Sequence, residues 1–154
     1  LTQLRTLSSN LGGDIADSFR LDLATMDNGT QPAKMFDEFR VVGGRMHFAP
    51  YDRYSKVSVS SRPLVVAFDN DADIPNQLTI SDVWQYGTAK VHNIDDPFVY
   101  SFSRPHLTKA AYWTDVNDAA GSKGEILVNA EGLTINTNYG EVFMELDFEF
   151  RSTR

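Results

Sequence analysis

The segment from Glu141 to Arg151 constrains the fold most. Every second residue in it is apolar and the residues between are mostly charged; the apolar set is Val142, Met144, Leu146, Phe148 and Phe150. Successive side chains of a β-strand point to opposite faces, so one face of this segment suits a core and the other suits water or a partner. The segment therefore predicts a long, two-faced strand whose apolar side is covered by a second layer of structure.

Length and composition fit one globular domain. The chain has 154 residues, of which 42% are hydrophobic and 23% charged, and this is enough to form a core without covalent staples. It has no cysteine, which excludes a disulfide framework, a thiolate metal site and a cysteine nucleophile. No apolar run approaches about 18 residues and no signal-peptide pattern is visible, so we expect no membrane partner.

The negative charge is unevenly distributed. Residues 1–60 hold seven acidic and seven basic residues, whereas residues 61–154 hold fourteen acidic and seven basic ones, for a net charge of −7. Bulk charge therefore argues against a general nucleic-acid binder, because such proteins neutralise phosphates with an excess of Lys and Arg.

Other segments also follow the pattern of strands. They span residues 18–24, 39–49, 63–68, 88–94, 98–104, 125–129 and 133–137, and short helices are predicted near residues 30–37 and 79–86. The inward set of residues 39–49 changes at Gly43-Gly44, which predicts a bulge or bend there. We interpret residues 1–16 as an irregular lead-in or arm remnant. Residues 17–154 are then an all-β domain, an eight-stranded antiparallel jelly-roll sandwich with two short helices in loops.

Several motifs, in order, are similar to one family of proteins. They are Phe36-Asp37-Glu38-Phe39-Arg40-Val41, the strand ending Met46-His47-Phe48-Ala49-Pro50, the apolar strand of residues 63–71, Phe102-Ser103-Arg104-Pro105, and residues 142–151. The pattern resembles single jelly-roll capsid proteins of small circular single-stranded DNA viruses and tombusvirus-like shell domains.

This resemblance implies a structural role without catalysis. Copies of the chain would assemble inside the host cell into an icosahedral shell, the virion, that encloses a viral genome. The genome would be bound through a basic arm, which is not among residues 1–154. The resemblance implies no cofactor except calcium ions between subunits.

One acidic cluster fits that calcium. Asp69, Asp71 and Asp73 place three carboxylates within five residues at the end of a strand, and hard cations prefer such oxygen ligands. The spacing does not match the known calcium-loop template, so solubilising turn residues are the other interpretation. Asp95 and Asp96 form a second acidic turn with the same ambiguity.

A second acidic pattern suggests an enzyme. Glu145, Asp147 and Glu149 resemble the Glu-x-Asp-x-Glu motif of jelly-roll glycoside hydrolases that cleave β-glucans, where carboxylates share one strand face. An exposed acidic strand gives the same alternation, and the motif lies closer to the end of the chain than in those hydrolases. A carbohydrate-binding or receptor-binding jelly-roll module is a third class that uses the same fold.

Basic and aromatic residues outside the core pattern are candidates for contacts. The basic candidates for nucleic-acid or subunit contact are Arg40, Arg45, Arg53, Lys56, Arg62 and Arg104, with scattered surface charge as the other interpretation. The aromatic candidates for a subunit interface are Tyr51, Tyr54, Trp84 and Trp113. We expect loops 50–62, 69–80 and 105–124 to make contacts between copies. His47, His92 and His106 show no ligand-like pairing.

Overall fold

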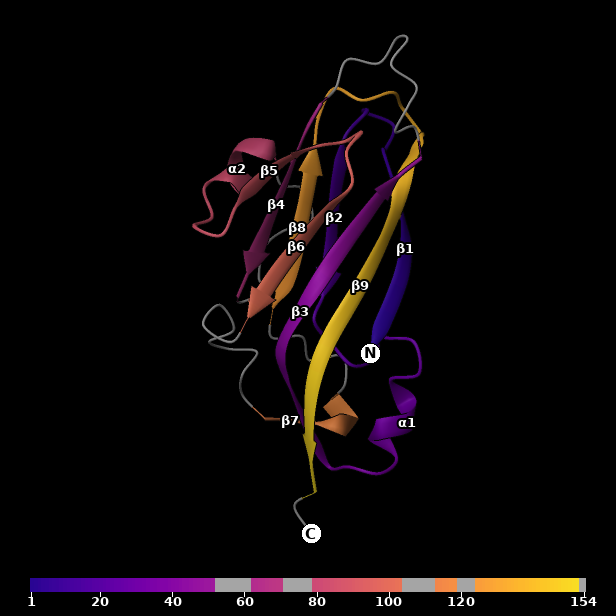
Figure 1. Ribbon diagram of the computed structural model, residues 1–154, viewed down its shortest axis with the longest axis vertical. Helices are drawn as coiled ribbons and strands as arrows, with labels where there is room; N and C mark the ends of the chain where they lie inside the picture. Colours follow the sequence, from indigo (N-terminus) through magenta and orange to yellow (C-terminus); the bar gives the residue numbers. More distant parts are fainter. Residues whose placement is uncertain (52–61, 71–78, 104–112, 119–123, 153–154) are drawn as a thin grey trace.

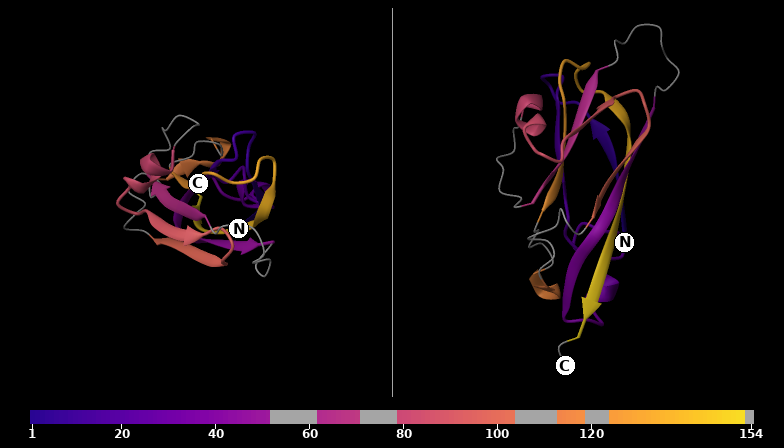
Figure 2. Two further views of the ribbon diagram at one scale, coloured as in Figure 1. Left: turned by 90° about the horizontal axis from the view of Figure 1, so that it is seen from above. Right: turned by 60° about the vertical axis from the view of Figure 1, so that its left-hand side comes forward.

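The structure is a computed structural model, and it describes residues 1–51, 62–70, 79–103, 113–118 and 124–152. Two antiparallel sheets face each other (Figures 1 and 2). Sheet A has the strand order β1 (Thr2–Ser8), β9 (Asn138–Arg151), β3 (Glu38–Pro50) and β6 (Phe98–Ser103), and β7 (Thr114–Asp115) pairs with β3. Sheet B has the order β2 (Ile15–Arg20), β8 (Glu125–Ala130), β4 (Pro63–Asp69) and β5 (Lys90–Asn93).

The connections make this sandwich a jelly roll. The chain passes from sheet A to sheet B and back at most of its connections, so sequential strands lie mainly in opposite layers. The structure therefore confirms the predicted all-β, antiparallel jelly-roll sandwich. The described residues also contain the short helices α1 (Thr30–Ala33) and α2 (Ile80–Trp84) and the 3₁₀ turn η2 (Val116–Asp118). Within the described part, no helix is long and apolar enough to cross a membrane.

The core lies between the sheets and is organised around β9. Val142, Met144 and Leu146 are at most 1% exposed, as their alternation predicts. Met144 lies directly across from Met46 of β3 on the inner face. The apolar face of the last strand is thus covered by the inner face of sheet B, which supplies the second layer that the sequence requires.

Strand β3 contains the predicted irregularity. Val41 pairs with Phe148 of β9 and Gly43 with Asp147, so Val42 is an extra residue without a register partner. The extra residue makes the odd-numbered and even-numbered residues of the strand change faces. Phe39 and Val41 are buried before the bulge, and Met46 and Phe48 are buried after it. The bulge therefore keeps both halves of this long strand facing the core.

Strand β4 is covered on both faces. Its residues after Pro63 are all buried. Leu64, Val66 and Phe68 join the central core, while Val65 and Ala67 pack beneath α2 on the other side. Helix α2 begins at a capping box in which Thr79 and Asp82 bond each other's backbone and side chains, as the residue pattern predicts. The helix thereby covers the outer face of sheet B over β4 and β8.

Three secondary-structure predictions were wrong. Residues 1–16 are not irregular throughout, because β1 pairs with β9 along its whole length and β2 already begins at Ile15. The segment predicted as a strand at 18–24 thus starts earlier and ends at Arg20. Residues 133–137 form a turn with Asn136 at positive φ instead of a strand. The described residues therefore contain two strands that were not predicted, β1 and β7, and lack the strand predicted at residues 133–137.

Candidate functional site

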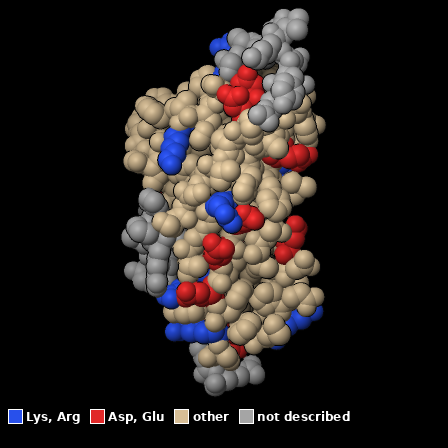
Figure 3. Space-filling view, in the orientation of Figure 1, with Lys and Arg blue, Asp and Glu red and all other residues tan. Residues whose placement is uncertain are grey.

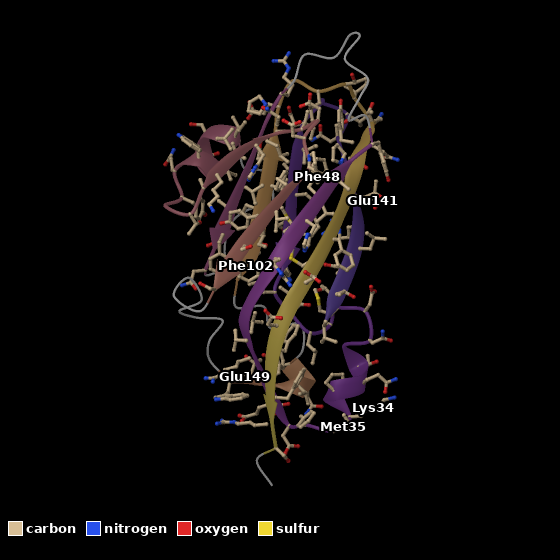
Figure 4. All side chains as sticks on the ribbon, in the orientation of Figure 1. Lys34, Met35, Phe48, Phe102, Glu141 and Glu149 are labelled. Atoms are coloured by element: carbon tan, nitrogen blue, oxygen red, sulfur yellow. The ribbon has the colours of Figure 1, made fainter. Side chains whose placement is uncertain are left out.

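The outer face of sheet A carries a ladder of ion pairs between its two central strands. Carboxylates of β9 and β3 pair with arginines directly across: Arg40 with Glu149 at 2.5 Å, Arg45 with Glu145 at 3.3 Å, and Arg151 with Glu38 at 2.5 Å. Figure 4 shows Glu141 and Glu149 toward opposite ends of β9. Two of the predicted basic contact residues, Arg40 and Arg45, are thus engaged within the chain.

Glu145 and Glu141 have further partners on this face. A ring nitrogen of His47 lies 2.8 Å from Glu145, and the hydroxyl of Tyr51 donates a hydrogen bond to Glu141. The hydrogen bond from His47, with a smaller contribution from Arg45, lowers the pKa of Glu145 below its ordinary value. Glu145 is therefore ionised at neutral pH and held in place by two neighbours.

This arrangement does not favour glycoside hydrolysis. Glu145, whose lowered pKa would suit a nucleophile and not a general acid, is already engaged by Arg45 and His47. Glu149 is held by Arg40, and Asp147 lies across from Gly43 on the exposed face. The three carboxylates therefore belong to a solvated strand face on which Glu145 and Glu149 are ion-paired, and this is the other interpretation of their alternation.

Trp113 stacks on two arginines at the far end of the ladder. Its ring centroid lies 4.6 Å from the guanidinium carbon of Arg40 and 4.3 Å from that of Arg151. Both arginines also pair with carboxylates, so the indole completes a cluster that joins the segment before β7 to β3 and β9. Cation–π contacts of this kind stabilise partly exposed sites.

Replacing Trp113 with alanine is expected to lower the free energy of unfolding by about 1–2 kcal/mol, because two cation–π contacts of ~0.5–1 kcal/mol each are lost. Urea unfolding followed by circular dichroism measures the change. Trp84→Ala is the matched control, since Trp84 is exposed on α2 and its loss should cost at most about 0.5 kcal/mol. Equal losses in both variants would contradict the role of the cluster.

The other predicted site residues lie apart from this face or outside the described residues. Arg62 is exposed just before β4, and its guanidinium lies beside Gly132. Asp69 is buried at the end of β4, across from Glu125 of β8. The remaining candidates, Arg53, Tyr54, Lys56, Asp71, Asp73 and Arg104, lie outside the described residues. No cluster of possible metal ligands occurs among the residues that the structure describes, and the calcium site stays a prediction.

Sequence reasoning missed an apolar row on the same face. Leu4 of β1, Phe143 of β9 and Val99 of β6 are exposed and lie in one row across sheet A, with His47 of β3 between the last two. Phe143 was the one apolar residue among the charged positions of β9, and this was the only signal available. Leu4 and Val99 can be placed beside it only when the strand register is known.

His92 is the histidine most affected by its surroundings. It stacks on Phe98 with ring centroids 3.9 Å apart, and its Nε2 is buried without a hydrogen-bond partner among the described residues. Burial, with a smaller contribution from Lys90, lowers the pKa of His92 below its ordinary value. The folded protein therefore holds this imidazole neutral at a pH where the unfolded chain begins to protonate it.

The free energy of unfolding is expected to decrease as the pH falls below about 6.5, because the unfolded state then binds a proton at His92 that the folded state does not. His92→Gln removes this contribution. Urea midpoints of both proteins at pH 7.5 and pH 5.0 test it, since the drop should be larger in the unmodified protein than in the variant. A drop of the same size in both would contradict the assignment.

Comparisons with known proteins bear on the fold. No protein-family model and no curated sequence matches the chain. The structure of Cocksfoot mottle virus is similar with a TM-score of 0.74 at 9% identity, over 100% of this chain and 93% of that one. A T=1 subviral particle of a Penaeus vannamei nodavirus capsid protein deletion mutant has a TM-score of 0.69 at 10% identity, over 99% and 92%. Melon necrotic spot virus has a TM-score of 0.72 at 14% identity, over 100% and 55%.

These similarities define the class of fold. At such low identity they concern the fold alone, and the fold is that of viral capsid jelly-roll shell domains. This confirms the resemblance to tombusvirus-like shell domains. The part of the expectation that named single-stranded DNA viruses finds no support in these structures.

Proposed function

We propose that this chain is a structural coat protein that assembles with copies of itself into an icosahedral shell around a viral genome. The observation that carries the proposal is the similarity to a viral shell protein over the whole chain, with 93% of the other chain covered. A neighbour with comparable coverage is itself a capsid protein in a T=1 particle. The protein would then reside in the virion after assembly in the host cell.

The surface of the described residues is consistent with a structural role. The carboxylates of the hydrolase-like motif lie on an exposed strand face, and Glu145 and Glu149 are ion-paired there. The arginines of the ladder are likewise neutralised within the chain. We therefore assign contact with the genome to other basic groups, namely Arg53, Lys56, Arg62, Arg104 and a basic arm outside residues 1–154.

Expression of the complete open reading frame tests this function. Negative-stain electron microscopy should show uniform closed particles, and the ratio of absorbance at 260 and 280 nm should reveal nuclease-protected nucleic acid. Small soluble species under all salt and calcium concentrations would contradict the proposal. Glycan binding by such species would favour the carbohydrate-binding class instead.

A further inference from the structure

The two outer faces of the sandwich differ in how they are covered. Helix α2 packs on sheet B, where Val83 contacts the buried Val65 and Leu127. The centre of the outer face of sheet A is open to view in Figure 3, where basic and acidic groups lie side by side and further acidic groups lie below and to the right amid uncharged surface. Among the described residues, no helix lies on that centre. Sheet A therefore presents a broad surface to a partner.

An exposed apolar row crosses the middle of this surface. Leu4 is 59% exposed, Phe143 39% and Val99 52%, and the row spans all four strands from β1 to β6. Single exposed apolar residues are common on proteins, but here the strand register aligns three of them in one row, with only His47 of β3 between Phe143 and Val99. Covering this row with apolar side chains of a partner would remove it from water.

The polar groups beside the row are already paired within the chain. Glu145 contacts Arg45 and His47, and Glu141 accepts hydrogen bonds from Tyr51 and from Thr6. Burying a charge is costly mainly when its partner is missing. A partner can therefore cover this surface without leaving these carboxylates unsatisfied.

The pairing of β3 with β9 makes the surface complementary to itself. Across these two central strands unlike groups are paired, Glu145 with Arg45 and Phe143 with His47. A two-fold axis parallel to the strands and midway between them exchanges the positions of β3 and β9. In a second copy facing the first, Glu145 then lies over Arg45, and each Phe143 over a His47.

The same two-fold axis also places the residues of the outer strands, and of the neighbouring row, over compatible residues of the second copy. It brings Leu4 of one copy over Val99 of the other, because β1 and β6 lie at equivalent positions on either side of the central pair. It also brings Asp147 over Gly43, which has no side chain, so that this carboxylate does not meet a like charge. The charges and sizes of three rows are thus compatible with one arrangement.

We propose that a second copy of this chain packs face to face on the outer surface of sheet A, related by a two-fold axis that runs parallel to β3 and β9. This inference rests on the proposed self-assembly and names one of its contacts. The surface measures roughly 20 Å by 20 Å at the usual strand spacings, or about 400 Å² per copy. Stable complexes bury about 800 Å² per partner, so the contact is weak alone and is populated within an assembled particle.

Cysteine cross-linking tests this arrangement because residues 1–154 contain no cysteine. In the double variant Leu4→Cys/Val99→Cys, the two thiols of one copy lie three strand spacings apart, roughly 14 Å. Between facing copies the same positions are separated by about 10 Å or less, the usual distance between packed sheets. A bis-maleimide of that shorter length should therefore shift the double variant to a covalent dimer on denaturing gels.

Three control variants define the results that would contradict the proposal. Leu4→Cys alone, Val99→Cys alone and Leu4→Cys/Val91→Cys should remain monomeric on the gel, because Val91 is exposed on sheet B, away from this surface. Efficient dimer formation by either single variant would place the axis in another direction and overturn the proposal. The absence of dimers from the double variant, including in concentrated samples, would also overturn it.

The same samples separate this inference from the proposed function. They are examined by electron microscopy before the cross-linker is added. Closed particles without cross-linked dimers would refute the face-to-face contact and leave the coat function intact. Cross-linked dimers without particles would support the contact while contradicting the coat function.

Discussion

Truncating Phe102 to alanine lowers the free energy of unfolding by about 3–5 kcal/mol, the usual cost of removing a buried phenylalanine. Phe102 of β6 is 5% exposed and stacks on Phe68 of β4, with ring centroids 5.6 Å apart. Figure 4 labels Phe102 on β6. The pair joins sheet A to sheet B, so the truncation leaves a cavity between the two layers that neither sheet can close alone.

Phe143→Ala is the matched control for this prediction. The chemical change is the same, but Phe143 lies on the outer face of sheet A, where His47 is its ring contact among the residues that the structure describes. Its loss should cost about 1 kcal/mol or less. Urea unfolding of both variants, followed by circular dichroism, gives the comparison. A larger loss in Phe143→Ala than in Phe102→Ala would mean that the inner and outer faces of sheet A are wrongly assigned.

Replacing Gly44 with alanine is expected to cost about 2–3 kcal/mol, because a side chain there overpacks the core. A Cβ atom at Gly44 would lie 2.6 Å from the carbonyl oxygen of Glu145 and 2.7 Å from the ring of Phe102. The first contact involves the backbone of β9, and the second a ring that is fixed against Phe68. The strands must therefore separate to admit the methyl group.

Gly87→Ala is the control for the glycine prediction. A Cβ atom at Gly87 meets nothing within 4 Å, so the substitution should change the unfolding free energy by at most about 0.5 kcal/mol. Thermal and urea unfolding of the two variants provide the measurement. Equal stability of both variants would show that β3 and β9 do not approach as closely as the structure has them.

The first strand shows where local patterns fail. Leu1, Leu4 and Leu7 follow a roughly helical spacing, yet residues 2–8 form a strand because they pair with β9. Leu4 and Leu7 consequently lie on opposite faces, and Leu7 is fully buried while Leu4 is exposed. The pairing with a distant strand determines this structure, and no property of the first residues alone predicts it.

The segment 133–137 shows the opposite error. Leu133, Ile135 and Thr137 alternate with polar residues, but Ile135 is exposed and Asn136 adopts a positive φ of 48°. Asparagine tolerates that conformation, and the resulting turn leads the chain directly into β9. The asparagine in this segment was therefore stronger evidence for a turn than the short alternation was for a strand.

The candidate site could be predicted only in part. The charged outer face of β9 and the bulge near Gly43 follow from residue patterns within single strands. The partners of those charges do not, because Glu145 meets Arg45 only through the register that the extra residue Val42 sets. The self-complementary surface depends on the same register, together with the positions of β1 and β6 in sheet A. The periodicity of the sequence predicts neither the register nor the positions of β1 and β6 in sheet A.

Sedimentation velocity on the complete open reading frame tests the proposed assembly most directly. A coat protein is expected to give one sharp, fast boundary of a closed particle, which absorbs more strongly at 260 nm when nucleic acid is enclosed. A slow boundary of monomers and small oligomers at every salt and calcium concentration would contradict the assignment as a coat protein.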